Sequence, residues 1–350
     1  MFLEKCERSY SDKKDTPMLK DYNRILVTGG AGFLGGHLVD ALISLDKEVV
    51  IFDNLSAEPH RDSLLGAKLA KGDVRIPRQV IQATKGVDLI FHLAANANGT
   101  ISVDDPRFDF ETNAVGTFNV LDAALHARVK KLVYVSSASV YGRPQYFPID
   151  EKHPTKPFIP YGASKLAGEI YCNSFFKTYN LPAVIARPFC VYGPGENPKL
   201  ALVEVTRYLR WHLNKKPIRI VGDIDRKTRD FVHVNDIIEG LLLIVDKAPA
   251  GEVFNVGSGK EVSMRELTKI ISSVTARSAV LNVIPEIKED TYRLVSDISK
   301  LKALGYAPKT SLVEGVKQLV KELGESPEMP RGATVFKKGQ KGEIQGSGGL

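Results

Sequence analysis

Tyr161 and Lys165 stand one helical turn apart in the segment "PYGASKLAGE", residues 160–169. Residues four apart share one face of a helix, so a phenol and an ammonium placed there can reach the same point. A nearby cation favours phenolate, which lowers the pKa of a tyrosine toward a value useful for proton transfer. A tyrosine and a lysine at this spacing more often belong to an ordinary solvent-exposed helix face. Other motifs in the chain must therefore show whether this pair is catalytic.

A glycine-rich turn near the start of the chain predicts a dinucleotide site. In "TGGAGFLG" (28–35), Gly29, Gly32 and Gly35 follow a predicted strand and open a predicted helix. This arrangement lets the backbone approach a pyrophosphate and aims a helix amino terminus at its charge. Asp53 ends the next predicted strand, where a carboxylate accepts from the ribose hydroxyls and repels a 2′-phosphate. We therefore predict NAD rather than NADP.

Short apolar runs alternate with helical patterns over the first half of the chain. We predict strands at 24–29, 48–53, 88–94, 131–137 and 182–188. Strands separated by helices indicate an α/β protein with a Rossmann-type, doubly wound parallel sheet and a smaller mixed α/β region. The expected division is a polar extension (1–22), an NAD-binding domain (23–190, with 230–257 returning to it), a substrate-binding region (191–229 and 258–323) and a disordered tail (324–350).

Composition excludes several other classes of protein. Hydrophobic residues make up 43% and charged residues 25%, and the formal net charge of +7 is spread along the chain. This favours an anionic small ligand over nucleic acid, and the basic stretch at 207–219 is expected to form an exposed amphipathic helix. The three cysteines and seven histidines show no metal-ligand spacing. With no apolar run long enough for a membrane span and no signal peptide, we expect a reduced, cytoplasmic protein.

Taken together, the motifs resemble the extended short-chain dehydrogenase/reductases. Within them the chain is most similar to the NAD-dependent epimerase/dehydratase family and its UDP-glucose 4-epimerase-like members. The resemblance covers about residues 24–323. It rests on "TGGAGFLG", "FDNLS", "GDV", "HLAA", "TNAVGT", "SSASVYG", "YGASK", "VYGPG", "TRDFVHVNDI", "NVGSG" and "LGY", which occur in this order.

The resemblance implies a role for individual residues. The catalytic group would be Ser137, Tyr161 and Lys165, with Ser137 and Tyr161 also touching the substrate. Arg229 and Arg293 would hold the phosphates of a nucleotide sugar. NAD would be bound by residues of the glycine turn, the strand ends and the active-site helices: Gly29, Gly32, Phe33, Leu34, Gly35, Asp53, Asn54, Asp73, Val74, Leu93, Ala94, Ala95, Asn113, Tyr161 and Lys165.

Two departures from the family pattern concern the substrate. Cys190 stands where many members have an asparagine that contacts the nucleotide diphosphate. The usual RxGD phosphate motif is replaced by "KED" (288–290), so Lys288 or Arg293 must supply the charge, or the site is weaker. A third feature concerns the reaction. Dehydratases carry an Asp-Glu pair after the catalytic Ser/Thr, and this chain has Ala138 and Ser139, which do not titrate usefully.

The leading hypothesis is a nucleotide-sugar 4-epimerase that acts on a UDP-hexose with tightly bound NAD. Alternatives within the family are a uronate epimerase, a dehydratase, a reductase, or an epimerase of a GDP- or dTDP-sugar. An alternative of another class is a catalytically silent NAD-binding regulator, which the intact Ser137, Tyr161 and Lys165 disfavour. The resemblance also implies a homodimer formed through the helices near 107–127 and 161–179.

Overall fold

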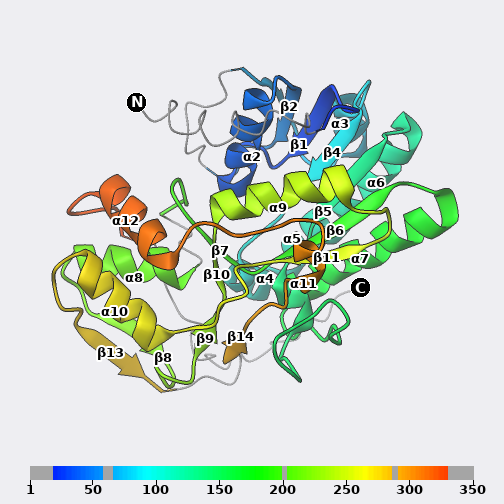
Figure 1. Cartoon of the computed structure of the whole chain (residues 1–350). Helices are drawn as coiled ribbons and strands as arrows, with labels where there is room; N and C mark the ends of the chain where they lie inside the picture. Colours follow the sequence, from blue (N-terminus) through cyan, green and yellow to red (C-terminus); the bar gives the residue numbers. More distant parts are fainter. Residues whose placement is uncertain (1–18, 58–65, 199–202, 286–290, 330–350) are drawn as a thin grey trace, which may run out of the picture.

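A parallel sheet of seven strands organises the chain (Figure 1). The computed structural model describes residues 19–57, 66–198, 203–285 and 291–329. The strand order is β11-β6-β5-β4-β1-β2-β3, and every neighbouring pair is parallel. The strands are β1 (Arg24–Thr28), β2 (Glu48–Asp53), β3 (Lys68–Lys71), β4 (Leu89–His92), β5 (Lys131–Val135), β6 (Ala183–Pro188) and β11 (Val253–Val256).

The predicted doubly wound sheet is confirmed. Because β1 pairs with both β2 and β4, the chain order reverses between β1 and β4, which places the ligand crevice of such sheets at their carboxyl ends. The sequence did not predict β3 or β11. Strand β3 is an edge strand with largely exposed side chains, so it lacks an apolar run. Strand β11 has only four residues and lies in the second half of the chain, outside the regular alternation of strands and helices.

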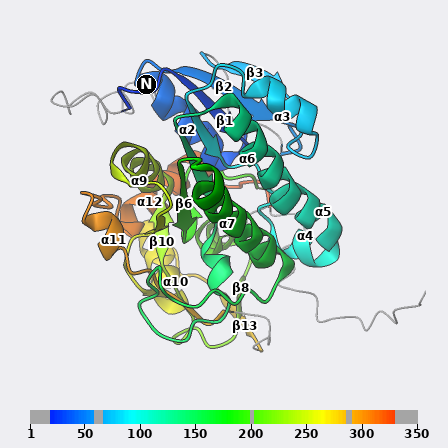
Figure 2. The same cartoon turned by 90° about the vertical axis from the view of Figure 1, so that its right-hand side faces the viewer.

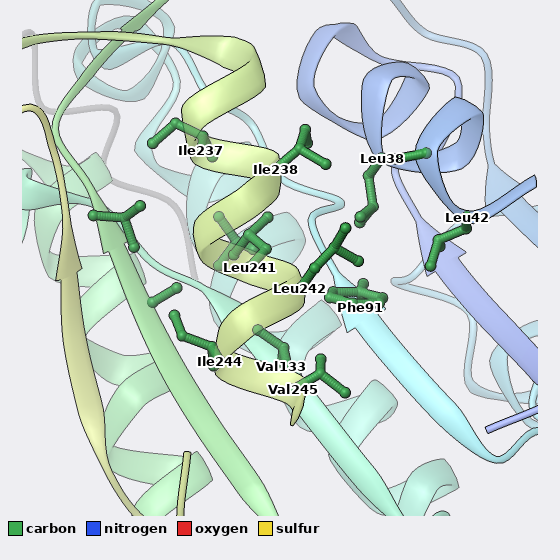
Figure 3. Packing of buried hydrophobic residues seen from close by; sticks show 14 of the residues in the cluster. Leu38, Leu42, Phe91, Val133, Ile237, Ile238, Leu241, Leu242, Ile244 and Val245 are labelled. Atoms are coloured by element: carbon green, nitrogen blue, oxygen red, sulfur yellow. The ribbon is translucent and has the colours of Figure 1, made fainter. Parts of the chain in front are cut away.

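Helices cover both faces of the sheet (Figures 1 and 2). Helices α2 (Phe33–Ser44) and α9 (Val234–Lys247) pack together on one face, where their apolar residues close over β1, β4 and β5 (Figure 3). The other face carries α3 (Pro77–Ala83), α6 (Gly116–Ala127) and α7 (Pro160–Tyr179). Between α3 and α6 the chain forms α4 (Gly99–Asp104), α5 (Pro106–Phe110) and the π-helix η1 (Glu111–Val115).

A smaller mixed region with its own apolar core completes the molecule. It holds three small sheets: β7 with β10, β8 with β13, and β12-β9-β14. Its strands are β7 (Cys190–Tyr192), β8 (Ile218–Val221), β9 (Thr228–Arg229), β10 (Phe231–His233), β12 (Val262–Ser263), β13 (Leu281–Ile284) and β14 (Arg293–Leu294). Its helices are α8 (Glu204–Leu213), α10 (Met264–Val274) and α12 (Leu312–Leu323), while α11 (Ser299–Lys302) packs against β11.

The expectation of an exposed basic helix at 207–219 was wrong. Helix α8 ends at Leu213, and the segment continues into strand β8. Tyr208, Leu209 and Trp211 are buried in the core of the smaller region, because its few short strands need an apolar helix face to cover them. Two basic residues of the helix, Arg210 and His212, are buried as well.

Parts of both predicted terminal segments contribute to the cores. Leu19 is only 1% exposed and packs with Tyr22 in the core beneath α2 and α9, although both fall within the predicted polar extension. At the other end, Met329 packs against the core of the smaller region. Residues 1–18 and 330–350 lie outside the described residues. The domain boundaries themselves remain predictions.

Leu241 tests whether α9 is an integral part of the larger core. Its side chain is fully buried between α9 and the sheet (Figure 3), so Leu241→Ala should lower the free energy of unfolding by about 2–5 kcal/mol. Val313→Ala, at a site 41% exposed on α12, should change it by less than about 1 kcal/mol. Urea unfolding followed by circular dichroism measures both. Equal effects of the two variants would contradict this packing.

Candidate active site

Helix α7 and strand β5 bring Ser137, Tyr161 and Lys165 together. Pro160 is the first residue of α7, a position whose N–H has no hydrogen-bond partner within the helix, so a proline is tolerated there. Tyr161 follows it. Ser137 comes directly after β5 and caps the short 3₁₀ helix η2 (Ala138–Tyr141), accepting from the Ser139 amide at 3.1 Å. The Ser137 hydroxyl hydrogen bonds to Tyr161, and the Lys165 ammonium donates to the Val135 carbonyl at 2.7 Å. The three residues therefore converge at the carboxyl end of β5.

The protonation of this pair differs from the sequence-based expectation. Burial raises the pKa of Tyr161, the Ser137 hydrogen bond lowers it, and the charge of Asp109 raises it further. Burial also lowers the pKa of Lys165 to about 8, against the opposing effect of the nearby carboxylates. We expected Lys165 to hold the pKa of Tyr161 below its usual range. That was wrong for this structure, because removing the phenol from water outweighs its neighbours.

The glycine turn has the shape that a dinucleotide pyrophosphate requires. Gly29 has φ +70°, and a Cβ there would lie 2.7 Å from the backbone nitrogen of Ala94. A Cβ on Gly35 would lie 2.1 Å from the Gly29 carbonyl oxygen. Helix α2 starts immediately after Gly32 and has no acidic residue in its first turn, so its free amides favour an anion.

Asp53 links this turn to the second strand. Its carboxylate accepts from the Ala31 amide at 3.0 Å and from the Leu55 amide at 2.8 Å. It thus lies against the turn, at the end of β2, where a ribose would lie in such a sheet. The residues present therefore fit NAD.

Two of the residues expected to bind NAD, Asn54 and Asp73, belong to one polar cluster. Asn54 donates to the Asp73 carboxylate at 3.3 Å, and Arg75 binds the same carboxylate through two nitrogens at 3.0 and 2.7 Å. The Arg75 hydrogen bonds hold the pKa of Asp73 at about 2. Val74 beside them is buried against the sheet core. Arg75 was not among the residues predicted for this site, although its charge two positions after Asp73 is visible in the sequence.

The loop after β4 is tied back to the glycine turn. Leu93 and Ala94 follow β4, and the Ala94 amide donates to the Thr28 hydroxyl at 3.2 Å. His92 lies between Thr28 and Thr117, at 2.7 and 3.0 Å. Burial lowers the pKa of His92 to about 3, so this ring is a neutral link. Phe33 and Leu34 lie in the first turn of α2, and Ala95 lies in this loop.

Asn113 lies in the π-helix η1 and joins four segments. Its side-chain amide contacts Ser164 on α7 at 3.1 Å and Asp109 on α5 at 3.0 Å, and it also binds the backbone of Asn96. Ser164 donates to Asp109 at 2.6 Å. The sequence pointed to Asn113 and missed Asp109, Asn96 and Ser164. A carboxylate one helical turn before Asn113 was the available signal.

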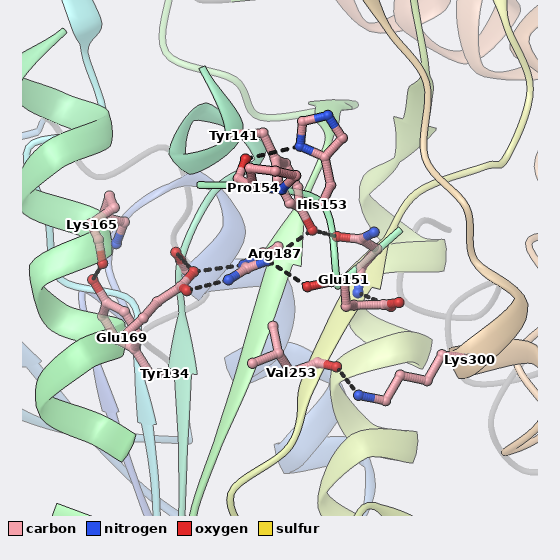
Figure 4. Close-up of polar contacts among 12 residues, drawn as sticks. Tyr134, Tyr141, Glu151, His153, Pro154, Lys165, Glu169, Arg187, Val253 and Lys300 are labelled. Carbon is pink, nitrogen blue, oxygen red and sulfur yellow. Dashed lines mark hydrogen bonds and ion pairs between the residues drawn. The ribbon is translucent and has the colours of Figure 1, made fainter. Parts of the chain in front are cut away.

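A second buried network lies one helical turn beyond Lys165, around Glu169 (Figure 4). Glu169, one turn after Lys165, accepts two bonds from Arg187 at 2.8 and 2.5 Å and one from Ser136 at 2.5 Å. Arg187 also binds the Tyr141 hydroxyl at 2.9 Å. Helix α7 is therefore fixed to β5, β6 and η2 by charged hydrogen bonds.

The two arginines predicted to meet the substrate occupy neighbouring strands. Arg229 on β9 is directly opposite Leu294 on β14, next to Arg293. Both arginines have acidic neighbours, since Arg229 lies 3.4 Å from Glu204 and Arg293 lies 2.5 Å from Glu261.

One of the chain's two departures from the family pattern lies near these arginines. Cys190 starts β7 beside this group, and burial raises the pKa of its thiol. Lys288 and its neighbours in 288–290 lie outside the described residues.

The acidic groups that dehydration needs are held elsewhere. Ala138 is buried, and the Ser139 hydroxyl has no hydrogen-bond partner among the described residues. Glu151 accepts from the Asn255 amide at 2.8 Å and lies beyond Arg187 when viewed from Lys165 (Figure 4). Asp150 is bound to the Tyr146 hydroxyl at 2.7 Å. The arrangement can therefore move a proton at Tyr161, and the two positions after Ser137 carry no acidic group.

Comparison with known proteins agrees with this geometry. Residues 25–257 match the model of the NAD dependent epimerase/dehydratase family. A protein of Methanocaldococcus jannaschii described as a putative UDP-glucose 4-epimerase is 37% identical over 300 residues, covering 85% of this chain and 97% of its own length.

Two solved structures are similar over most of their length. The UDP-glucose 4-epimerase of Thermotoga maritima, solved with UDP-glucose, has a TM-score of 0.81 at 32% identity and covers 85% of this chain and 98% of its own. A dTDP-glucose 4,6-dehydratase from Streptomyces venezuelae, solved with NAD bound, has a TM-score of 0.79 at 30% identity, with coverages of 85% and 96%. Overall likeness therefore does not separate the two reactions, and the site residues must do so.

Asp53 provides a test of the dinucleotide site. Asp53→Ser removes a charged acceptor and should weaken NAD binding by roughly 10-fold or more, while weakening discrimination against NADP. Glu48→Ser, at the exposed start of the same strand, should leave both affinities unchanged. Isothermal titration calorimetry with each dinucleotide measures the effect. Unchanged NAD affinity in the Asp53 variant would show that the ribose lies elsewhere.

Proposed function

This chain belongs to the NAD-dependent epimerase/dehydratase family, and we propose that it is a UDP-hexose 4-epimerase. The observation that carries the proposal is the convergence of Ser137, Tyr161 and Lys165 at the end of β5 without an acid pair beside them. The named relative and the UDP-glucose-bound neighbour support the choice of a UDP-sugar. The cytoplasmic location inferred from the sequence stays a prediction.

In the proposed reaction, Tyr161 and Ser137 handle the O4 hydroxyl of the sugar. NAD supplies the hydride acceptor and donor at C4. The Tyr161 phenolate takes the O4 proton, and the Ser137 hydroxyl that already bonds Tyr161 steadies the oxygen. After the 4-keto sugar has turned over, Tyr161 returns the proton. Because each turnover regenerates the cofactor, we expect NAD to remain bound throughout.

Lys165 would act on the phenolate and on the ribose of the cofactor. Its ammonium is fixed by the Val135 carbonyl and lies 4.8 Å from the centre of the Tyr134 ring. Burial keeps the pKa of Tyr161 raised in the free site, and a cation one helical turn away would stabilise the phenolate during proton transfer. We assign the residues of the glycine turn, the strand ends and Asn113 to NAD binding, as the resemblance to the family implies.

Arg229 and Arg293 are proposed to bind the diphosphate of the substrate. They lie on paired strands, with Arg293 opposite Thr228 and Arg229 opposite Leu294, so their side chains leave opposite faces of this small sheet and would reach one diphosphate from different sides. Glu204 and Glu261 now neutralise them, and a bound diphosphate would have to share or replace these contacts. This arrangement offers a charge source that does not depend on the missing RxGD motif.

A 4,6-dehydratase is the second candidate because of the structural neighbour of that name. Elimination of water needs a general acid and base near C5 and C6 of the sugar. Ala138 and Ser139 occupy the two positions that follow Ser137, and Glu151 is held by Asn255. The residues therefore favour epimerisation.

We also propose that the enzyme is a homodimer formed through α5, α6 and α7. Large apolar side chains are exposed on these helices: Phe110 is 56%, Phe118 40%, Ile170 60%, Tyr171 43% and Tyr179 54% exposed. An apolar surface of this kind on neighbouring helices is typical of an association surface.

Ile170→Glu tests the dimer by placing a charge in the apolar surface. We expect a dimer for the parent and a monomer for this variant in sedimentation velocity. Ile81→Glu, at an α3 site 46% exposed, is the control and should remain dimeric. A parent that sediments as a monomer at micromolar concentration would rule out this assembly.

Tyr161→Phe tests the catalytic assignment, because it removes the proton acceptor and keeps the ring. We expect turnover of UDP-glucose to fall at least ~100-fold with NAD still bound. Tyr179→Phe, on the exposed part of the same helix, should be fully active. Activity within a few-fold of the parent in the Tyr161 variant would show that another group moves the O4 proton.

A further inference from the structure

Asp109 is a fully buried carboxylate that the proposed reaction does not use. It accepts from Ser164 at 2.6 Å, from Asn96 at 2.8 Å and from Asn113 at 3.0 Å. All three donors are neutral, and within the described parts of the chain no basic nitrogen forms an ion pair with Asp109. Burying a carboxylate is unfavourable unless a charge of opposite sign lies nearby, so its presence behind the catalytic helix needs a physical reason.

The buried charges around Lys165 supply that reason. Lys165 is 3% exposed, and two buried carboxylates lie along the same helix: Asp109 accepts from Ser164, the residue before Lys165, and Glu169 follows one turn after it. Glu169 is already matched by its bidentate bonds to Arg187 (Figure 4). Asp109 is therefore the one carboxylate of this group left to balance the Lys165 ammonium.

The other titratable groups facing Lys165 are neutral. Burial lowers the pKa of His92 to about 3, and it raises the pKa values of the Tyr134 phenol and the Cys172 thiol. Lys165, Arg187, Glu169 and Asp109 thus form a group of two positive and two negative charges. Removing the charge of Asp109 would leave this buried group with a net positive charge.

We propose that Asp109 is a positioning residue that balances the buried charge of Lys165 and holds α7 in register through Ser164. It touches neither Tyr161 nor Lys165 directly, and it acts on them through its charge and through the hydroxyl of Ser164, which lies between them on the helix. The same charge disfavours the Tyr161 phenolate. Asp109 therefore sets the pH range of the site as a whole.

The first experiment compares Asp109→Asn with Ser164→Ala in the NAD-loaded enzyme. Asp109→Asn removes the charge, whereas Ser164→Ala removes the hydrogen bonds of that hydroxyl with Asp109, Asn113 and the Tyr161 carbonyl and keeps the charge. The Tyr161 phenolate is titrated by its absorbance difference against Tyr161→Phe, and the pH dependence of turnover is measured in parallel. We expect both the tyrosine titration and the falling alkaline limb of turnover to move to lower pH by roughly half a unit or more in Asp109→Asn only. Coincident curves for Asp109→Asn and the parent, or equal shifts in both variants, would overturn the proposal.

The second experiment measures charge balance without any activity. Asp109→Asn is made in the parent and in a Lys165→Met background, and thermal unfolding is recorded. If the two charges balance, the loss in Tm caused by Asp109→Asn is smaller in the Lys165→Met background by at least about 2 °C. If Asp109→Asn alone does not fold but Asp109→Asn combined with Lys165→Met does, the proposal is supported more strongly. Equal losses in both backgrounds would contradict the proposal.

Only the turnover measurement rests on the proposed function. The tyrosine titration and the unfolding cycle need no substrate, so they distinguish failure of this inference from failure of the epimerase assignment.

Discussion

The burial of an ammonium beside a phenol is the interaction on which the rest of this site depends. Lys165 must be removed from water to meet the cofactor and Tyr161, yet burial lowers its pKa to about 8. The protein responds with two carboxylates, one matched by Arg187 and one held by neutral donors. Glu169 attaches α7 to β6 and Asp109 attaches it to α5, so the electrostatic balance and the position of the catalytic helix have the same source.

The sheet supplies the second constraint. Its order reverses between β1 and β4, and the strand ends on either side of this point carry the glycine turn and the loop that follows His92. Gly29 and Gly35 cannot accept a side chain, because the turn, the loop and α2 approach within contact distance. The nicotinamide end of a cofactor bound there would lie toward β5, where Ser137 begins η2. The fold therefore places the predicted cofactor site and the proton acceptor on neighbouring strand ends.

Much of the fold and the candidate site could be predicted from sequence because local patterns determine them. The strand at 48–53 was placed at its observed bounds, and Tyr161 and Lys165 lie on one helix face as their spacing requires. Long-range pairing could not be predicted in this way. The link from Asp109 to Ser164 spans different helices, and the bidentate bond from Arg187 to Glu169 joins β6 to α7. The raised pKa of Tyr161 likewise depends on burial, which spacing does not reveal.

The central claim is that this site changes the configuration at C4 and eliminates nothing, because Ala138 and Ser139 stand where an acid pair would be needed. The most direct measurement is to incubate the purified enzyme with UDP-glucose and resolve the products by chromatography and mass spectrometry. We predict a second UDP-hexose of the same mass as the substrate, with no net accumulation of NADH. A product lighter by one water, or no conversion of a UDP-hexose by the NAD-loaded protein, would contradict it.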